Sequence, residues 1–444
     1  MASRNLSRSF AGLAIFLFIN ASFVFFILSP YIENPLGRGL ETRTLEEVDQ
    51  RIESVRKGNF TLTLQSPDGT PLQNRRIVYR QTGHDFFFGC NIFEFNRLDD
   101  PQENELYKKY FKNLFNLAVL PFYWREDEPE PGNFPRAEFR QEILTWCEQN
   151  GITPKGHPLA WRNPAGYPDW LPEDRERVAG RLQSRIENTV EEYKGRIKIW
   201  DVVNEPTHLP PFGYPTTFEY VYHALQWAHA KDPEALLTVN DYGILGHDFG
   251  SGPYRQLLAR LIQNRAPINC IGFQGREPRT DWIPAYEIRA TLEAYSKLGL
   301  PLHLTEITVP SADLPITNSW KKGVWNEPNQ ADYLENFYKI CFSHPSVGAI
   351  IYWDLYDGAS WVKHGGLINV NWEPKPAYQR LSRLLNEEWR SQGSGRTDEN
   401  GEFAFTGFYG TYEISIPDLA KKFPIIAPRE GANNFLVTLS VNSP

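Results

Sequence analysis

Short apolar runs alternate with longer amphipathic segments along most of the chain. The eight runs begin at Phe86, Leu117, Thr153, Ile197, Leu236, Cys270, Leu302 and Ala349. Such runs are typical of buried strands, and the helix-length segments between them predict parallel βαβ units. Eight units across roughly 300 residues fit an α/β fold of the (β/α)8 TIM barrel type. The alternative is an open doubly wound sheet, which would need a glycine-rich phosphate loop that the sequence lacks.

Alternating apolar and polar positions flank the predicted barrel on both sides. The alternation from Phe60 to Leu64, the turn sequence SPDGTP and the resumed alternation at Ile77 predict a β-hairpin over residues 58–85. Residues 391–444 repeat this pattern around a second turn. Because a hairpin alone is marginally stable, we predict that both segments pair into one small β-module beside a catalytic barrel over residues 86–390.

An apolar segment lies near the N-terminus. The run from Phe10 to Leu28 is nearly long enough to span a bilayer, and Arg4 and Arg8 precede it. Bulky residues fill the place of a signal cleavage site, so we expect residues 1–29 to be a membrane anchor rather than a cleaved signal. The basic flank predicts an extracytoplasmic catalytic region, membrane-anchored or, after cleavage, secreted. Residues 30–57 are polar and predict a tether with a short exposed helix.

Amino-acid composition and net charge indicate which kind of molecule the protein binds. The 444-residue chain has 13 Trp and 21 Tyr, and flat aromatic rings stack on sugar faces, although an aromatic-rich core explains the composition equally well. The net charge of −8 argues against a nucleic acid partner. The four cysteines lie far apart, without metal-ligand spacing. We therefore predict buried free thiols at Cys90, Cys270 and Cys341, which lie in apolar runs, and no metal site.

Polar and aromatic residues follow the predicted strands, where barrels of this type place their chemistry. They are His157, Trp161, Asn204, Glu205, Asn240, Asp241, Gln274, Arg276, Glu306, Trp353, Asp357 and Trp361. Glu205 and Glu306 end the fourth and seventh strands. Retaining hydrolysis of a glycosidic bond needs one carboxyl group as proton donor and a second as nucleophile. One structural carboxylate at a strand end is common, whereas two at one barrel mouth predict this chemistry.

A set of motifs then points to a family. WDVVNEP around Glu205, HLTEI around Glu306, GHPLAW at His157, NDY, IGFQG and PKPAYQRL together resemble glycoside hydrolase family 10, the β-1,4-xylanases, from about Phe86 to Leu385. The resemblance implies net retention, no cofactor, Glu205 as acid/base, Glu306 as nucleophile and a polysaccharide substrate, with xylan expected. It also implies sugar contacts from His157, Trp161, Asn204, Gln274, Trp353 and Trp361. Asn204 would bond the 2-hydroxyl in the transition state.

The sequence departs from the family pattern in two places. The family's Glu-Asn-x-x-Lys cluster after the second strand, which grips the sugar two units from the cut, is replaced by LPFYWR. Tyr123 could substitute by stacking, or could merely wall the cleft. The family's His after the sixth strand is Arg276, and its Asp after the nucleophile is Thr308. We expect Arg276 to contact substrate or to lower the pKa of Glu306.

Two alternatives stay open. The substrate could be another β-glycan, such as glucan, mannan or a surface glycan, since barrels of this type host several specificities. The chain could also be a membrane-tethered sugar-binding protein without turnover, although the intact carboxylate pair opposes this. His157 as a core histidine and the tryptophans as core filling are the structural alternatives for those residues. We expect a monomer.

Overall fold

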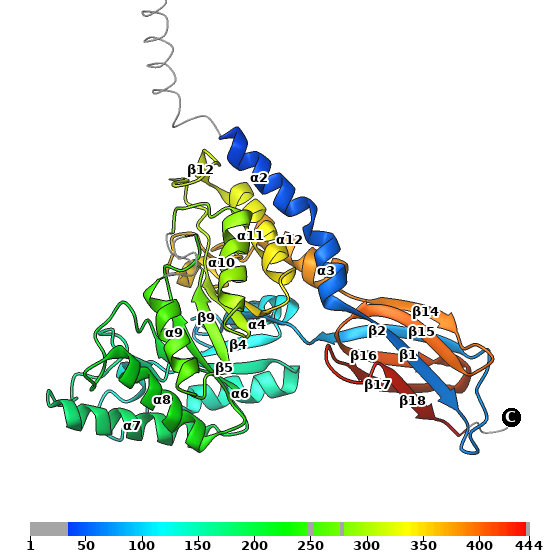
Figure 1. The fold of residues 1–444 in the computed structure, drawn as a ribbon, viewed down its shortest axis with the longest axis horizontal. Coiled ribbons are helices and arrows are strands. Elements are labelled where there is room, and N and C mark those ends of the chain that lie inside the picture. Colours follow the sequence, from blue (N-terminus) through cyan, green and yellow to red (C-terminus); the bar gives the residue numbers. More distant parts are fainter. Residues whose placement is uncertain (1–33, 247–251, 276–278, 441–444) are drawn as a thin grey trace, which may run out of the picture.

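Eight parallel strands form a closed barrel in the computed structural model, which describes residues 34–246, 252–275 and 279–440 (Figure 1). The strands are β3 (Phe87–Asn91), β4 (Leu117–Pro121), β5 (Thr153–His157), β7 (Ile199–Asn204), β8 (Leu236–Asp241), β9 (Cys270–Gln274), β10 (Leu302–Ile307) and β13 (Val347–Tyr352). Each pairs with its neighbour, and the β5–β7 and β13–β3 pairings close the ring. The short β6 (Ala160–Trp161) extends the edge of β7. The predicted barrel is confirmed, because all eight apolar runs form its strands.

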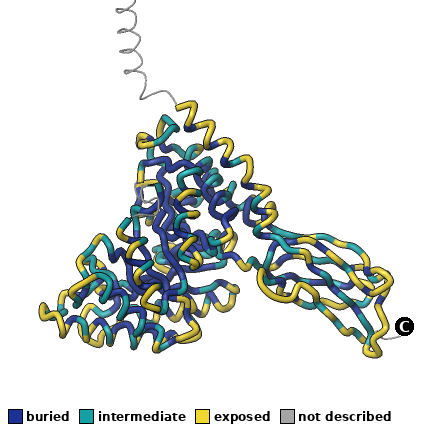
Figure 2. The backbone as a smooth tube through the Cα atoms, viewed as in Figure 1, coloured by how far each residue is buried: buried dark blue, intermediate teal, exposed yellow. Residues whose placement is uncertain are grey.

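Helices surround the barrel and cover the outer faces of its strands. They are α4 (Pro101–Leu114), α6 (Ala137–Asn150), α7 (Arg175–Glu192), α8 (Thr217–Lys231), α9 (Pro253–Gln263), α10 (Ala285–Ser296), α11 (Glu327–Phe342) and α12 (Pro376–Arg383), with the short α5 (Trp124–Asp127) after β4. Figure 2 shows the buried backbone concentrated between these helices. Strands covered on both sides are apolar at almost every position, which is why they read as continuous runs.

Two small sheets form a β-sandwich beside the barrel (Figure 1). One sheet has the order β15 (Glu402–Phe408), β1 (Lys57–Gln65), β18 (Asn434–Thr438). The other has the order β14 (Gln392–Arg396), β2 (Arg76–His84), β16 (Gly410–Ile416), β17 (Lys421–Ala427). The predicted hairpin over residues 58–85 is wrong, because β1 and β2 lie in different sheets. A two-stranded hairpin would leave Phe60, Leu62 and Ile77 exposed on one face, whereas the sandwich buries them between the sheets.

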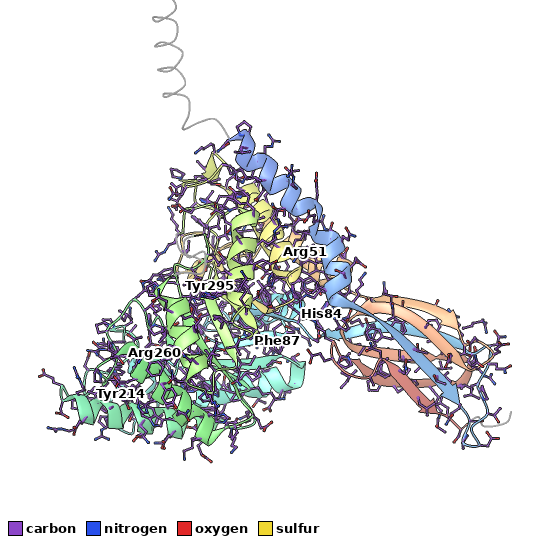
Figure 3. The ribbon with its side chains drawn as sticks, in the orientation of Figure 1. Arg51, His84, Phe87, Tyr214, Arg260 and Tyr295 are labelled. Atoms are coloured by element: carbon purple, nitrogen blue, oxygen red, sulfur yellow. The ribbon has the colours of Figure 1, made fainter. Side chains whose placement is uncertain are left out.

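The junction between sandwich and barrel is aromatic. His84, labelled in Figure 3, ends β2 and lies with its ring against Phe88, Phe342 and Phe408. Burial lowers the pKa of His84 to about 3, so the ring is neutral at physiological pH. The sandwich therefore packs on the barrel through a dry contact rather than hanging from a free linker.

The segment expected to be an exposed tether is two packed helices, α2 (Pro35–Glu46) and α3 (Val48–Arg56). They lie along the outside of the barrel against α10 and α11 (Figure 1). Arg56 donates hydrogen bonds to the carbonyls of Phe342, His344 and Val347. The exposed-helix prediction is wrong because the buried face of α2 consists of Gly37, Glu41 and Thr44, which no hydrophobic periodicity reveals.

The carboxylate of Glu41 fixes α2 to the barrel. It accepts a hydrogen bond from the backbone N–H of Ala285 at 2.6 Å, at the start of α10. Burial raises the pKa of Glu41 to about 7. A side chain at Gly37 would lie 2.5 Å from Trp320, so α2 and the barrel approach one another closely there.

Two further predictions concern the cysteines and the apolar run near the N-terminus. Cys90, Cys270 and Cys341 are free and buried, as predicted, and Cys147 is free and buried as well. The apolar run from Phe10 to Leu28 lies outside the described residues. Among the residues that the structure does describe, no helix is long and apolar enough to cross a membrane.

Candidate active site

Two glutamates at the carboxyl ends of barrel strands share an unusual backbone conformation. Glu205 directly follows β7 and Glu306 lies near the end of β10, with φ angles of 54° and 56°. A left-handed conformation costs a residue other than glycine of the order of 1–3 kcal/mol, and such outliers cluster at functional sites. Both residues are buried, at 8% and 2% exposed. The two strand ends are therefore constrained in the same way at the two predicted catalytic positions.

A chain of amide side chains links the two carboxyl groups. Asn240 Nδ2 lies 2.8 Å from Glu306 Oε1 and 2.8 Å from Asn204 Oδ1. Gln274 Nε2 lies 2.9 Å from Glu205 Oε1 and 3.5 Å from Asn204 Oδ1. The buried amides thus hold both carboxyl groups in one network, and a buried network whose members are satisfied is rigid.

The second carboxyl oxygen of Glu205 accepts a hydrogen bond from a residue of β6. The indole Nε1 of Trp161 donates to Glu205 Oε2 at 2.8 Å. Gly166 packs against the backbone of Trp161 so tightly that an added side chain would lie 2.4 Å from its carbonyl oxygen. Glu205 therefore receives one donor from each side, which fixes the plane of its carboxyl group.

His157 lies between the nucleophile position and a buried ion pair. Its Nδ1 donates to Asp201 Oδ2 at 2.8 Å, and its Nε2 lies 3.7 Å from Glu306 Oε1. Lys155 Nζ lies 2.9 Å from the other oxygen of Asp201. Burial opposes ionisation of Asp201, but Lys155 and His157 hold its pKa below the usual range. The ionised Asp201 fixes the tautomer of His157, so that Nε2 faces Glu306.

The loop that follows Glu205 is fixed by Asp241. Thr207 donates to Asp241 Oδ2 from its backbone N–H at 3.0 Å and from its hydroxyl at 2.7 Å. His208 lies 3.3 Å from the other oxygen and stacks on Tyr242. Burial raises the pKa of Asp241 to about 6. Asp241 therefore acts on the loop and is not among the residues that line the cleft.

The mouth opens into a cleft of about 650 Å³. Its lining includes Tyr123, Trp161, Glu205, Gln274, Trp353 and Trp361 from the predicted set. Glu306, His157 and Asn204 lie buried beneath it, within the contacts described above. Trp353 is 5% exposed whereas Trp361 is 50% exposed, so the two tryptophans differ in how much ring surface they offer to a ligand.

Aromatic rings replace the missing polar cluster. Phe93 contacts Tyr123 and Trp353 edge to face, with centroids 5.9 and 5.3 Å apart. Tyr123 also lies 5.8 Å from the rings of both His157 and Trp161. We call Phe93, Tyr123, His157, Trp161 and Trp353 the aromatic wall. Because Tyr123 lies beside His157, and His157 lies 3.7 Å from Glu306, the wall is close to the buried Glu306.

Sequence reasoning missed several cleft residues and misplaced one. Phe93 and Tyr242 line the cleft, and each follows its strand by one or two positions, which was the available signal. Asp357 does not line the cleft but forms a buried ion pair with Lys375 at 2.7 Å. Arg276 lies outside the described residues, and Thr308 donates to the carbonyl of Trp353 at 3.1 Å.

Metal ligation has no candidate in the part of the chain that the structure describes. No group of three or more His, Cys, Asp and Glu side chains there could hold a metal ion. The described residues of the mouth include two buried carboxyl groups, amide donors and aromatic rings. A parallel barrel that presents this combination at its carboxyl end defines the class of barrel glycoside hydrolases.

Comparison with known proteins gives the family. Residues 78–384 match the family described as "Glycosyl hydrolase family 10", and the chain belongs to this family. The anti-sigma-I factor RsgI6 of Acetivibrio thermocellus is 27% identical over 90% of this chain and 49% of its own length. Endo-1,4-beta-xylanase 2 of Arabidopsis thaliana is 28% identical over 83% of this chain and 33% of its own. The chain thus spans half or less of the length of these curated relatives.

Shorter relatives match the barrel alone. Endo-1,4-beta-xylanase B of Thermotoga neapolitana is 30% identical over 65% of this chain and 86% of its own length. The crystal structure of xylanase 10B from Thermotoga petrophila RKU-1 in complex with xylobiose is 26% identical, with a TM-score of 0.57 over 68% of this chain and 95% of that one. These two matches cover 65% and 68% of this chain, whereas the match to the anti-sigma-I factor covers 90% of it.

Proposed function

We propose that this chain is a retaining glycoside hydrolase that cleaves β-1,4-linked polysaccharide, with xylan as its substrate. The observation that carries the proposal is the pair of left-handed, buried glutamates joined by Asn240, Asn204 and Gln274. The relatives named as endo-1,4-beta-xylanases support the choice of xylan.

The proposed reaction has two displacements. Glu306 attacks the anomeric carbon as the glycosidic C–O bond breaks, and Glu205 transfers its proton to the departing oxygen. Glu205 then takes a proton from water, whose oxygen attacks the same carbon and breaks the ester bond to Glu306. Two inversions give net retention, and both carboxyl groups return to their starting states. Asn204 and His157 would contact the sugar bound between them, and Trp161 and Gln274 hold Glu205 toward the bond.

The test is product analysis on purified xylan, β-glucan and mannan. We expect new reducing ends from xylan, with the β-anomer detected first by proton NMR. First release of the α-anomer would mean inversion, and cleavage confined to glucan or mannan would replace the substrate assignment. Glu306→Gln is the matched variant, because it keeps the size of the side chain and removes the nucleophile.

Glycan sensing without turnover is the second candidate. It is favoured by the relative named as an anti-sigma-I factor, whose match covers 90% of this chain. The complete carboxylate network argues for turnover instead. Sugar binding by the wild type with no reducing ends from any of the three polymers would establish sensing.

We also propose that the run from Phe10 to Leu28 anchors the chain in a membrane with the barrel outside the cytoplasm. The support is the length of the run and its basic flank. The full chain should stay with membranes through an alkaline carbonate wash. Recovery of a soluble form that begins near residue 30 would show cleavage. For the released barrel and sandwich we propose a monomer, which light scattering would test.

A further inference from the structure

A second groove lies beside the cleft. Its volume is about 590 Å³, and its walls are the loop from Arg162 to Glu173 with the first turn of α7, and the loop from Pro210 to Pro215. The first loop follows Trp161 and the second follows Glu205, so both walls begin at residues of the candidate active site. Trp161 and Asn163 line the cleft, whereas Arg162 and Tyr167 line the groove. The cleft and the groove are thus the two sides of one chain segment.

The groove has the chemistry of a sugar site. The half-buried Tyr167 and Tyr214 give it ring surfaces, whereas Phe212 is 3% exposed and only fills the wall. Asp169, Glu173 and Arg175 give it hydrogen-bonding groups. Tyr214, labelled in Figure 3, stacks on His223 at 5.0 Å, which holds its ring in place. Flat rings combined with a few polar groups suit pyranose faces and hydroxyl groups.

The walls of the groove are fixed before any ligand binds. Arg162 lies over the rings of Tyr167 and Phe212 at 5.8 and 5.1 Å, and it donates to the carbonyl of Pro211 at 3.3 Å. It therefore joins one wall to the other. Gly213 has a φ of 76° and packs so closely on α7 that an added side chain would lie 2.9 Å from Ala179 N. A preformed groove binds without the cost of ordering loops.

We propose that this groove binds a second stretch of the β-linked polysaccharide and so holds the polymer at the cleft. The inference rests on the proposed function for its ligand. Three observations select a glycan over other occupants: continuity with the cleft through Trp161 and Arg162, ring surfaces on both walls, and a mixed rather than one-signed set of charges. An acidic or basic partner would need a groove of the opposite charge.

The experiment counts binding sites in the full-length Glu306→Gln protein by titration calorimetry with xylohexaose. We expect two sites. Replacing Tyr167 and Tyr214 by Ala in that background should remove one site or weaken it at least tenfold. The matched control is Tyr286→Ala, a half-buried ring on α10 that does not line the groove, and it should keep both sites. A single site in the parent, or two sites of unchanged affinity in the double variant, would overturn the inference.

Hydrogen exchange decides the question if the double variant fails to fold. In the parent Glu306→Gln protein, xylohexaose above the concentration that saturates the cleft should slow exchange in residues 210–215. Unchanged exchange in these residues would show that the groove does not bind the oligosaccharide. The proposed function fails separately, when the wild type releases no reducing ends from xylan.

Discussion

Two neighbouring regions of the mouth are held together in different ways: the aromatic wall and the polar centre. The polar centre consists of Glu205 and Glu306 with the amides of Asn204, Asn240 and Gln274. In the centre, Glu205 and Glu306 receive hydrogen bonds from buried amides and an indole, and each contact has one donor and one acceptor. In the wall, Phe93 and Tyr123 meet their neighbours through ring edges and faces. Directional bonds fix the position of a reacting atom, whereas ring contacts tolerate small shifts. Under the proposed function, we expect the centre to set the chemistry and the wall to set which sugar is bound.

Removing the nucleophile tests the centre most severely. Glu306→Gln should lower kcat by on the order of 10⁴-fold or more, because the attacking oxygen has no substitute. Binding of xylohexaose should persist, since the amide keeps the shape of the site. Stopped assays with xylan measure the first, and calorimetry measures the second. Ordinary turnover by the variant would exclude Glu306 as the nucleophile.

Beside the polar centre, Asp241 fixes the loop that follows Glu205, and it should make the stability of the protein depend on pH. Burial raises the pKa of Asp241 from 3.8 to about 6, so the native state keeps this proton to higher pH than the unfolded chain. The resulting stability is present below about pH 4 and is lost as pH rises to about 6, by about 3 kcal/mol. Asp241→Asn should abolish that part of the decline. Urea unfolding at pH 4 and pH 6.5 measures it, and equal pH dependence in both proteins would contradict it.

Breaking the amide chain should cost less than removing the nucleophile. Asn240→Ala leaves Glu306 Oε1 and Asn204 Oδ1 without their shared donor, and we expect kcat to fall about 100-fold. The control is Asn264→Ala, an exposed asparagine at the end of α9, which should keep the wild-type kcat. If the two variants turn over xylan equally fast, the network is not needed to position the carboxyl groups.

The smallest effect is expected at the wall, and it should fall on KM. Tyr123→Ala removes ring surface that touches His157 and Trp161, so KM for xylan should rise about tenfold, or about 1.4 kcal/mol. Tyr123→Phe keeps the ring and should stay within about twofold. A fall in kcat with unchanged KM would mean that Tyr123 acts with the polar centre, and it would contradict the difference proposed between the two regions.

The barrel and its centre could be predicted because their signals are local. Strands covered on both faces read as apolar runs, and Glu205 and Glu306 come at the ends of two of them. The sandwich could be predicted only in outline. β1 pairs with β15 and β18, more than 300 positions away in the numbering, and alternation does not name a strand's partner.

The docked helix and the aromatic wall show a different limit. α2 buries Gly37, Glu41 and Thr44, so its contact depends on a close approach and one hydrogen bond rather than on apolar periodicity. Phe93 reaches the cleft because the chain turns just after β3. Neither the turn nor the docking has a local sequence signature, since both are set by neighbouring elements.

The docked helices give the molecule a mechanical property. α2 and α3 have 12 and 9 residues, so at about 1.5 Å per residue they form an arm of roughly 30 Å along the barrel. A pull applied at Asn34 would load the bond from its backbone N–H to the Trp320 carbonyl first, then the Glu41–Ala285 bond, and the three bonds of Arg56 last. The barrel would therefore carry the tension before it reached the β-sandwich. The arm would pass the force to the barrel and protect the sandwich from it.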